Sequence, residues 1–123
     1  MLRRSLVSVV DDDDSVRESL PDLLMEFGFA VRAFSSAEEF LASDRMDQTR
    51  CLILDVAMPG MSGPDLQREL RSRGSRIPIV FITAHADDIV RPRLIELGAV
   101  DCLVKPFSDT ALRAALDVAL GER

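Results

Sequence analysis

The 123-residue sequence has no tryptophan, no tyrosine, a single histidine and only two cysteines. Two cysteines in apolar surroundings do not indicate a disulfide framework or a metal site, so Cys51 and Cys102 are predicted to be reduced core residues, as is usual in the cytosol. No apolar run approaches the roughly 20 residues of a membrane span. The apolar stretch that follows Met1-Leu2-Arg3-Arg4 is too short for a signal peptide and soon meets acids. We therefore expect an unprocessed, cytoplasmic protein without membrane contact.

Positive charge is scarce as well, since 15 lysines and arginines are outnumbered by 21 aspartates and glutamates, for a net charge of -6. Proteins bind nucleic acid through basic residues that meet phosphates, so this chain is not expected to bind nucleic acid directly. Its length falls within the usual size of one domain, and its 47% hydrophobic content is enough for a core. We predict a single domain over residues 1–123.

Short apolar runs rich in β-branched residues alternate with amphipathic runs. The short runs predict five strands, at residues 6–10, 30–34, 51–55, 79–83 and 100–104. Apolar residues at helical spacing predict a helix after each strand; the first ends at Gly28, the second is capped by Ser35-Ser36 and the fifth by Ser108. Strands that are apolar throughout are buried on both faces, and short βα units force parallel crossovers. The predicted fold class is therefore α/β, a doubly wound sandwich.

Acidic residues end two of the predicted strands. Asp55 closes the run 51–55, and the cluster Asp11 to Asp14 follows the run 6–10. If both strands are parallel members of one sheet, their carboxyl ends lie side by side, where such sheets bind ligands. Crowded carboxylates repel one another, so either one is protonated or a cation lies among them. Oxygen-only ligands favour a hard ion such as Mg2+.

Two more strands place a polar group at the same edge. Thr83 ends the strand 79–83, and Lys105 follows the strand 100–104. Each has a common structural explanation when taken alone, because a strand-end threonine usually bonds to backbone and a lysine is usually a surface cation. Asp13 and Asp14 are better explained as loop and first-turn acids favoured by the helix dipole. The joint placement of polar groups after four of the five strands is what favours a functional site.

Four motifs lie at these strand ends: Val9-Val10-Asp11-Asp12, Leu54-Asp55-Val56-Ala57-Met58-Pro59-Gly60-Met61-Ser62-Gly63, Phe81-Ile82-Thr83-Ala84 and Val104-Lys105-Pro106-Phe107. Through them the sequence closely resembles the receiver domain of two-component response regulators, the CheY-like family, and the match covers essentially the whole chain. The resemblance implies a flavodoxin-like (βα)5 sandwich with a five-stranded parallel sheet of order 2-1-3-4-5.

By this resemblance, Asp55 accepts a phosphoryl group from the phosphohistidine of a sensor histidine kinase. Asp12 is implied to be a direct ligand of Mg2+, Asp11 a ligand acting largely through water, and the backbone carbonyl of Ala57 a further ligand beside Asp55 itself. The chain would accept the group and assist its own phosphorylation and dephosphorylation without being an enzyme in the ordinary sense.

Thr83 and Lys105 are implied to bind the phosphoryl oxygens. A carboxylate attacks an anionic phosphoryl group only where charge is neutralised and the reactants are held in line, which favours these residue types. A threonine hydroxyl can donate to the new phosphoryl oxygen, and its movement would convert the modification into a change of shape.

The sequence departs from the family pattern on the face formed by the fourth helix, fifth strand and fifth helix, which usually reads out phosphorylation. Cys102 stands where an aromatic residue normally swings inward, so the aromatic switch is predicted to be absent or altered. Pro92 removes a backbone donor inside the fourth amphipathic run, so that helix should start late, near Pro92, or bend there. His85, where receivers often tune access of water, is interpreted as an ordinary loop residue.

Within receivers, runs such as Phe34-Ser35-Ser36-Ala37-Glu38-Glu39-Phe40-Leu41 most resemble the FixJ type of transcription regulators, which commonly carry a C-terminal helix-turn-helix. The chain has no such output domain after its fifth predicted helix. We expect either a piece of a two-domain transcription regulator, which the likeness favours, or a stand-alone receiver that acts in a phosphorelay or as a protein-interaction switch. The resemblance also suggests homodimerisation through the helix 4-strand 5-helix 5 face on phosphorylation.

Two other classes share the topology or the nucleophile. A flavodoxin-like electron carrier needs a Ser/Thr/Gly-rich loop for the flavin phosphate after the first strand, where four aspartates would repel it. A phosphatase with an aspartyl nucleophile needs a second acid two residues after Asp55, where Ala57 stands. Both classes are therefore disfavoured. Visible absorption by flavin, or repeated release of phosphate from esters, would distinguish them from a receiver.

Overall fold

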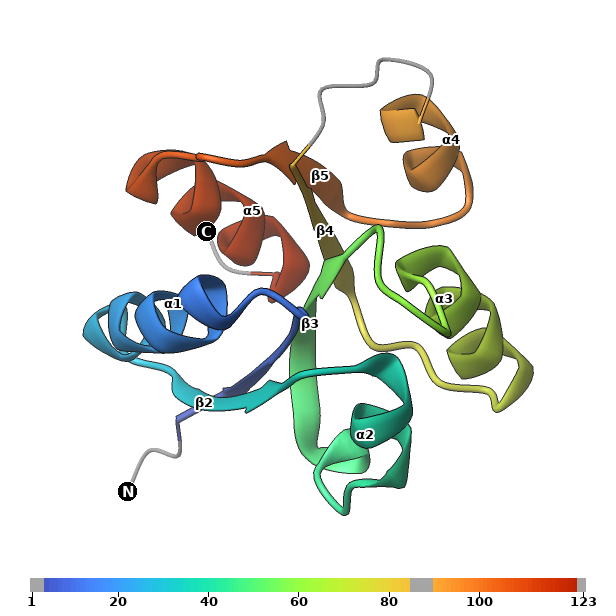
Figure 1. Cartoon of the computed structure of the whole chain (residues 1–123). Coiled ribbons are helices and arrows are strands. Elements are labelled where there is room, and N and C mark those ends of the chain that lie inside the picture. The colour runs from blue at the N-terminus through green and yellow to red at the C-terminus, as the bar shows by residue number, and fades with distance from the viewer. Residues whose placement is uncertain (1–3, 85–89, 122–123) are drawn as a thin grey trace.

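Five parallel strands form one central sheet (Figure 1). The computed structural model describes residues 4–84 and 90–121. The strand order is β2-β1-β3-β4-β5, and every neighbouring pair is parallel, which confirms the predicted fold class and order. The strands are β1 (Leu6–Val10), β2 (Ala30–Phe34), β3 (Thr49–Asp55), β4 (Ile79–Thr83) and β5 (Asp101–Val104).

Helices cover both faces of the sheet. They are α1 (Asp14–Glu26), α2 (Ala37–Ala42), α3 (Gly63–Ser72), α4 (Val90–Glu96) and α5 (Asp109–Ala119). In Figure 1, α1 and α5 lie on one side of the sheet, and α2, α3 and α4 on the other. Two predicted caps are confirmed, because Oγ of Ser36 accepts from the Glu39 amide and Oγ of Ser108 from the Ala111 amide, both at 3.0 Å. Among the described residues, no helix is long and apolar enough to cross a membrane.

The core consists of two apolar layers, one on each face of the sheet. On β3, Cys51 and Ile53 pack in the layer under α1 and α5, whereas Leu52 and Leu54 pack in the layer under α2, α3 and α4. All four side chains are fully buried. Successive strand residues point to opposite faces, so a strand covered on both faces requires an uninterrupted apolar run. This explains why the strands could be predicted from the sequence.

The two cysteines are free and buried, as predicted. Cys51 belongs to the layer under α1 and α5, and Cys102, on β5, to the opposite layer, so the sheet separates the two sulfur atoms. Burial raises the pKa of Cys51 to about 12 and also raises the pKa of Cys102. Both thiols therefore stay protonated at neutral pH and act as core side chains.

Some boundaries differ from the sequence prediction. β3 begins at Thr49, two residues before the apolar run, where the Thr49 hydroxyl bonds to the buried Ser8 hydroxyl of β1 across 2.7 Å. β5 begins at Asp101 instead of residue 100. A single 3-10 turn, η1 (Met46–Gln48), precedes β3 and is absent from the prediction. Polar strand pairs and single turns have no apolar period, so hydrophobic spacing does not reveal them.

The described part of α4 runs from Val90 to Glu96, directly after residues 85–89, which lie outside the description, and it includes Pro92. The backbone donors of a first turn have no intrahelical partner, so proline is tolerated there. The start of α4 borders residues outside the described part of the chain, so the predicted late start or bend near Pro92 stays a prediction. His85 lies outside the described residues, and its interpretation stays a prediction.

The first residue of α3 lies directly against the end of β3. A Cβ atom on Gly63 would stand 2.4 Å from the carbonyl oxygen of Asp55 and 2.9 Å from Cε1 of Phe81. The Gly63 amide also donates to the carbonyl of Val56 at 3.0 Å. Any side chain at this position would therefore push α3 away from Asp55.

We expect Gly63→Ala to lower the free energy of unfolding by about 1–3 kcal/mol, the usual cost of overpacking. Urea denaturation followed by far-UV circular dichroism measures this. The matched control is Gly74→Asn, because Gly74 has φ +78° and open space around its Cα, and asparagine tolerates that backbone conformation. A midpoint for Gly63→Ala equal to that of the parent would contradict the close approach of α3 to β3.

Candidate functional site

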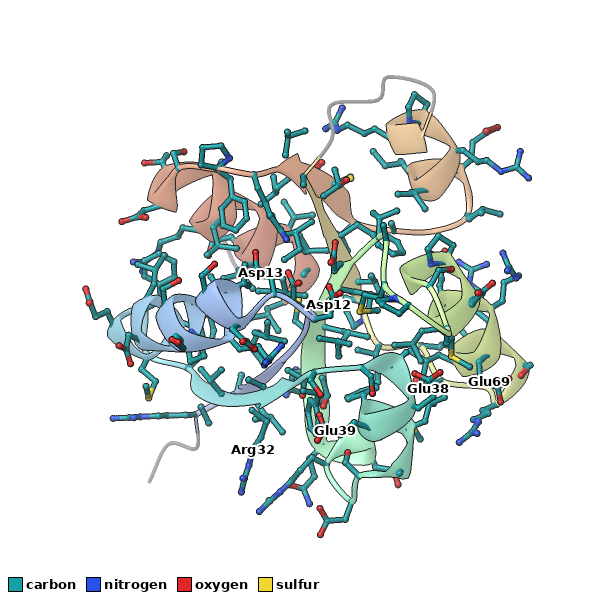
Figure 2. All side chains as sticks on the ribbon, in the orientation of Figure 1. Asp12, Asp13, Arg32, Glu38, Glu39 and Glu69 are labelled. Carbon is teal, nitrogen blue, oxygen red and sulfur yellow. The ribbon has the colours of Figure 1, made fainter. Side chains whose placement is uncertain are left out.

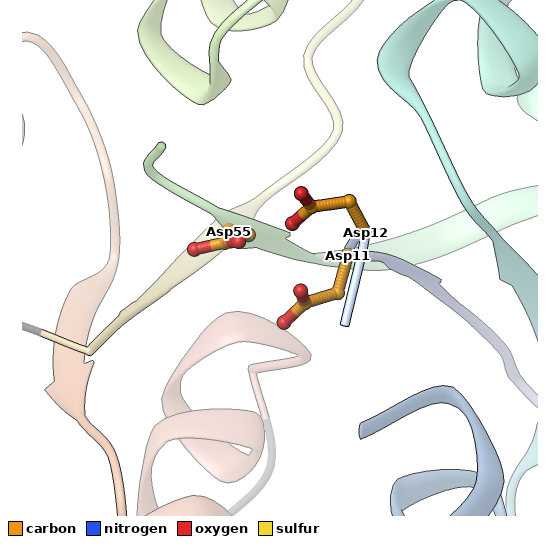
Figure 3. A group of neighbouring side chains, drawn as sticks. All are labelled: Asp11, Asp12 and Asp55. Carbon is orange, nitrogen blue, oxygen red and sulfur yellow. The ribbon is translucent and has the colours of Figure 1, made fainter. Parts of the chain in front are cut away.

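Strand pairing brings the predicted acids together. β1 and β3 are neighbours, with Val10 opposite Leu54, so the residues that follow them lie at the same edge of the sheet. Asp11, Asp12 and Asp55 each offer a carboxylate oxygen, and these oxygens lie within 4.8 Å of one another. Figure 3 shows the three carboxylates pointing to the same side. Oxygen donors at this spacing fit a hard divalent cation.

Asp11 is fully buried and held from several directions. Its amide donates to the Phe34 carbonyl at 3.1 Å, and its Oδ1 accepts from the Asp13 amide at 2.9 Å. Its Oδ2 lies 2.9 Å from Nζ of Lys105. The carboxylate of Asp11 is therefore charge-compensated and fixed in place before any ligand arrives.

Lys105 is fixed by backbone as well as by charge. Its amide donates to the Thr83 carbonyl at 2.8 Å, which ties the residue after β5 to the end of β4. Burial lowers the pKa of Lys105, but the bond to Asp11 and the charges of Asp55 and Asp11 raise it, and the net shift is upward. The ammonium therefore stays protonated at physiological pH.

The structure places the remaining predicted site residues as follows. Thr83, partly buried, ends β4 one residue after Ile82, which pairs with Asp55 of β3. Ala57 lies two residues beyond Asp55 in the exposed part of the loop that leads to α3. The strand ends thus bring the Thr83 hydroxyl, the Lys105 ammonium and three carboxylates to one edge of the sheet. The roles inferred for Thr83 and Ala57 remain proposals.

In the metal-free protein, the ionised form of the Asp55 carboxyl group is disfavoured. Burial is the largest cause, the charge of Asp11 adds to it, and Lys105 opposes it, so that the pKa of Asp55 rises to about 7. Asp55 is only 6% exposed. A bound cation would favour the charged form, and ionisation of Asp55 is therefore coupled to cation binding.

The rest of the acidic cluster has the structural role predicted for it. Asp13 caps α1, because its Oδ1 accepts from the amide and from the hydroxyl of Ser15 at 2.9 Å and 2.8 Å. The same bonds hold the pKa of Asp13 below its usual range. Asp14 is the first residue of α1. Figure 2 shows Asp12 and Asp13 following β1, with Glu38 on α2.

Two residues near the site escaped the sequence analysis. Nη1 of Arg17 donates to the backbone carbonyl of Asp11 at 2.8 Å. Oε2 of Glu38 accepts from the Met61 amide at 3.1 Å, which ties α2 to the loop after β3. For Arg17, the sequence shows only a basic residue in the helix that follows an acidic strand end. Nothing in the sequence connects Glu38 with Met61, which are 23 residues apart.

A comparison with protein families decides what kind of domain this is. The family model described as response regulator receiver domain matches residues 7–117. The chain belongs to this family. This confirms the family resemblance predicted from the four strand-end motifs.

The receiver domain has close relatives of known name. It is 44% identical over 125 residues to the response regulator protein TodT of Pseudomonas putida, covering 98% of this chain and 55% of TodT. It is 44% identical over 115 residues to the transcriptional regulatory protein FixJ of Azorhizobium caulinodans, covering 94% of this chain and 54% of FixJ. The receiver domain thus spans about half the length of these curated relatives.

A solved structure agrees with the sequence relatives. The crystal structure of FixJ-N matches with a TM-score of 0.86 at 38% identity, over 99% of this chain and 98% of that chain. The predicted likeness to the FixJ type is therefore confirmed in both sequence and fold.

The raised pKa of Asp55 predicts a pH dependence of stability in the metal-free receiver domain. Between pH 3.8 and about 7, folded Asp55 holds its proton while unfolded Asp55 has lost it, so stability falls as pH rises. That window lies above the lowered pKa of Asp13 and below the raised pKa of Lys105, which leaves their contributions constant. Asparagine has no proton to lose, so the free energy of unfolding of Asp55→Asn should not show this fall. We expect the stability of Asp55→Asn relative to the parent to increase by about 1–3 kcal/mol as the pH rises from 5 to 8.

Urea unfolding of parent and Asp55→Asn with a chelator, at several pH values, measures this difference. A stability difference that does not change with pH would contradict the raised pKa of Asp55.

Proposed function

We propose that this receiver domain is a phosphoacceptor, in which Mg2+-dependent transfer from the phosphohistidine of a sensor histidine kinase modifies Asp55. The position of Asp55 supports this most. Its buried carboxylate lies beside those of Asp11 and Asp12, and the Lys105 ammonium is bound to Asp11. A nucleophile, an oxygen-only cation site and a fixed ammonium thus meet at one sheet edge.

In the proposed transfer, a carboxylate oxygen of Asp55 attacks phosphorus while the bond from phosphorus to the imidazole nitrogen of the kinase breaks. The electron pair of that bond returns to nitrogen, so an imidazole protonated on its other nitrogen leaves as neutral histidine. Only the ionised carboxylate has the free electron pair for this attack, and its raised pKa must be overcome by positive charge.

The residues that would hold Mg2+ are Asp11, Asp12 and Asp55, with the carbonyl of Ala57. When bound, Mg2+ supplies positive charge that favours ionised Asp55 and neutralises the phosphoryl oxygens. Lys105 contributes a second positive charge. Its ammonium, 2.9 Å from Asp11, can turn toward a phosphoryl oxygen and remain within the acidic site.

Thr83 is proposed to donate its hydroxyl to a phosphoryl oxygen and so to link Asp55 to the face formed by α4, β5 and α5. Thr83 pairs with Val104 in the β4–β5 ladder. Cys102, buried on β5, has no ring that could swing inward. In this chain the response at β5 would therefore depend on Thr83 and its strand neighbours, without an aromatic rotation.

The proposed output is control of transcription through a domain outside this chain. TodT and FixJ are about twice as long as the matched region, and FixJ is named a transcriptional regulatory protein. The alternative is a stand-alone receiver that passes the phosphoryl group on or binds a protein partner. The full reading frame around this sequence distinguishes the two.

Intact-mass measurement after incubation with acetyl phosphate and Mg2+ tests the phosphoacceptor. We expect one phosphoryl adduct on the parent, none on Asp55→Asn, and none when a chelator removes the metal. The control is Asp44→Asn, which alters an acid whose side chain is 94% exposed and should leave the adduct unchanged. An adduct on Asp55→Asn would show that Asp55 is not the acceptor.

Phosphorylation is also proposed to promote a homodimer through the α4-β5-α5 face. Ile95 of α4 and Val104 of β5 remain 39% and 38% exposed, although both are apolar. We expect the phosphorylated parent to sediment as a dimer, and Ile95→Glu to accept the phosphoryl group but stay monomeric, because a buried charge disfavours the interface. Dimerisation of phosphorylated Ile95→Glu would exclude this face.

A further inference from the structure

Arg17 reaches from α1 back to the end of β1. Its Nη1 donates to the carbonyl oxygen of Asp11 at 2.8 Å, and its Nη2 is paired with the carboxylate of Asp14. The side chain of Arg17 is only 24% exposed, whereas that of Asp14 is 83% exposed. The guanidinium therefore lies against the acidic loop, and its outer partner, Asp14, is the more exposed of the two.

The carbonyl that Arg17 contacts controls the direction of the next residue. Asp11 lies beyond the last paired residue of β1, Val10, so its carbonyl is past the end of the sheet ladder. The peptide group is planar, so a donor on this oxygen fixes the plane that joins Asp11 to Asp12. The orientation of that plane sets where the Asp12 side chain leaves the backbone.

A second bond completes the restraint on the loop. The amide of Asp13 donates to Oδ1 of Asp11 at 2.9 Å, which holds the residue on the far side of Asp12. Asp12 itself is exposed and is flanked by these two restraints. Without Arg17, the carbonyl oxygen of Asp11 would lose this donor, and Asp11 would be held through its amide by Phe34 and through its carboxylate by Asp13 and Lys105.

The charge of Arg17 acts in the opposite direction. A guanidinium bonded to the Asp11 carbonyl repels a cation that approaches the acidic site, so charge alone would make Arg17 weaken cation binding. The ion pair between Arg17 and Asp14 weakens the repulsion between Arg17 and a cation but does not reverse it. Positioning and charge therefore predict opposite signs for the effect of removing Arg17.

We propose that Arg17 is a positioning residue for the acidic site, holding the Asp11–Asp12 peptide so that the Asp12 carboxylate stays beside those of Asp11 and Asp55. The inference rests on the proposed function for its ligand, Mg2+. Residues that orient metal ligands change metal affinity by about 10–100-fold when they are removed. For Arg17, whose restraint is shared with the Asp13 amide, the lower end of that range is expected.

Titration of the isotope-labelled protein with Mg2+, followed by amide chemical shifts, tests this inference. We expect Arg17→Met to raise the dissociation constant about tenfold. Arg17→Lys keeps the charge but cannot contact both Asp11 and Asp14, so it should also weaken binding. The matched control is Arg32→Met, which removes an exposed arginine on β2 and should leave the dissociation constant unchanged. Equal or tighter Mg2+ binding by Arg17→Met would overturn the positioning role.

Amide hydrogen exchange without metal gives a readout that does not depend on the proposed function. Arg17→Met should speed exchange at Asp13, whose amide bonds to Asp11, and leave exchange at Ile53 of the core unchanged. Unchanged exchange at Asp13 would overturn the inference. If the parent binds no Mg2+, the proposed function fails, and the exchange result still decides whether Arg17 holds the loop. If Arg17→Met does not fold, Arg17→Lys provides the same two measurements.

Discussion

Burial of one acid among other acids at one sheet edge is the constraint on which the site depends. Burial and the charge of Asp11 disfavour ionised Asp55, and only Lys105 opposes them among the groups that shift its pKa. Asp55, the proposed nucleophile, is thus held where its ionised form is unfavourable until positive charge arrives. The same imbalance that makes Asp55 a poor anion in the metal-free protein makes its ionisation responsive to a cation.

The arrangement follows directly from the sheet. Because β1, β3, β4 and β5 are consecutive neighbours, the residues at their carboxyl ends meet without any long connecting loop. Asp11, Asp55, Thr83 and Lys105 are therefore held by strands whose side chains are packed in two apolar layers. The strand ends thus position the site residues, and the helices that follow form the outer layers of the domain.

Much of the fold and part of the site could be predicted because they depend on local pattern. Unbroken apolar strands, serine caps and acids after strands 6–10 and 51–55 are visible in order along the chain. The roles of Asp12, Ala57 and Thr83 came from family resemblance, and proximity alone does not assign them. The roles of Gly63 and Arg17 could not be predicted from the sequence. Gly63 matters because the folded chain brings Asp55 and Phe81 against it, and Arg17 because its side chain reaches the carbonyl of Asp11.

The contact between Gly63 and the end of β3 has a mechanical consequence. The Gly63 amide bonds to the Val56 carbonyl, which closes the segment from 56 to 63 into a ring, and Glu38 clamps Met61 within it. A loop closed in this way has fewer backbone conformations open to it than a free loop of the same length. The loop that carries Ala57 is therefore tied at its base to the residue after β3 and, near its end, to α2.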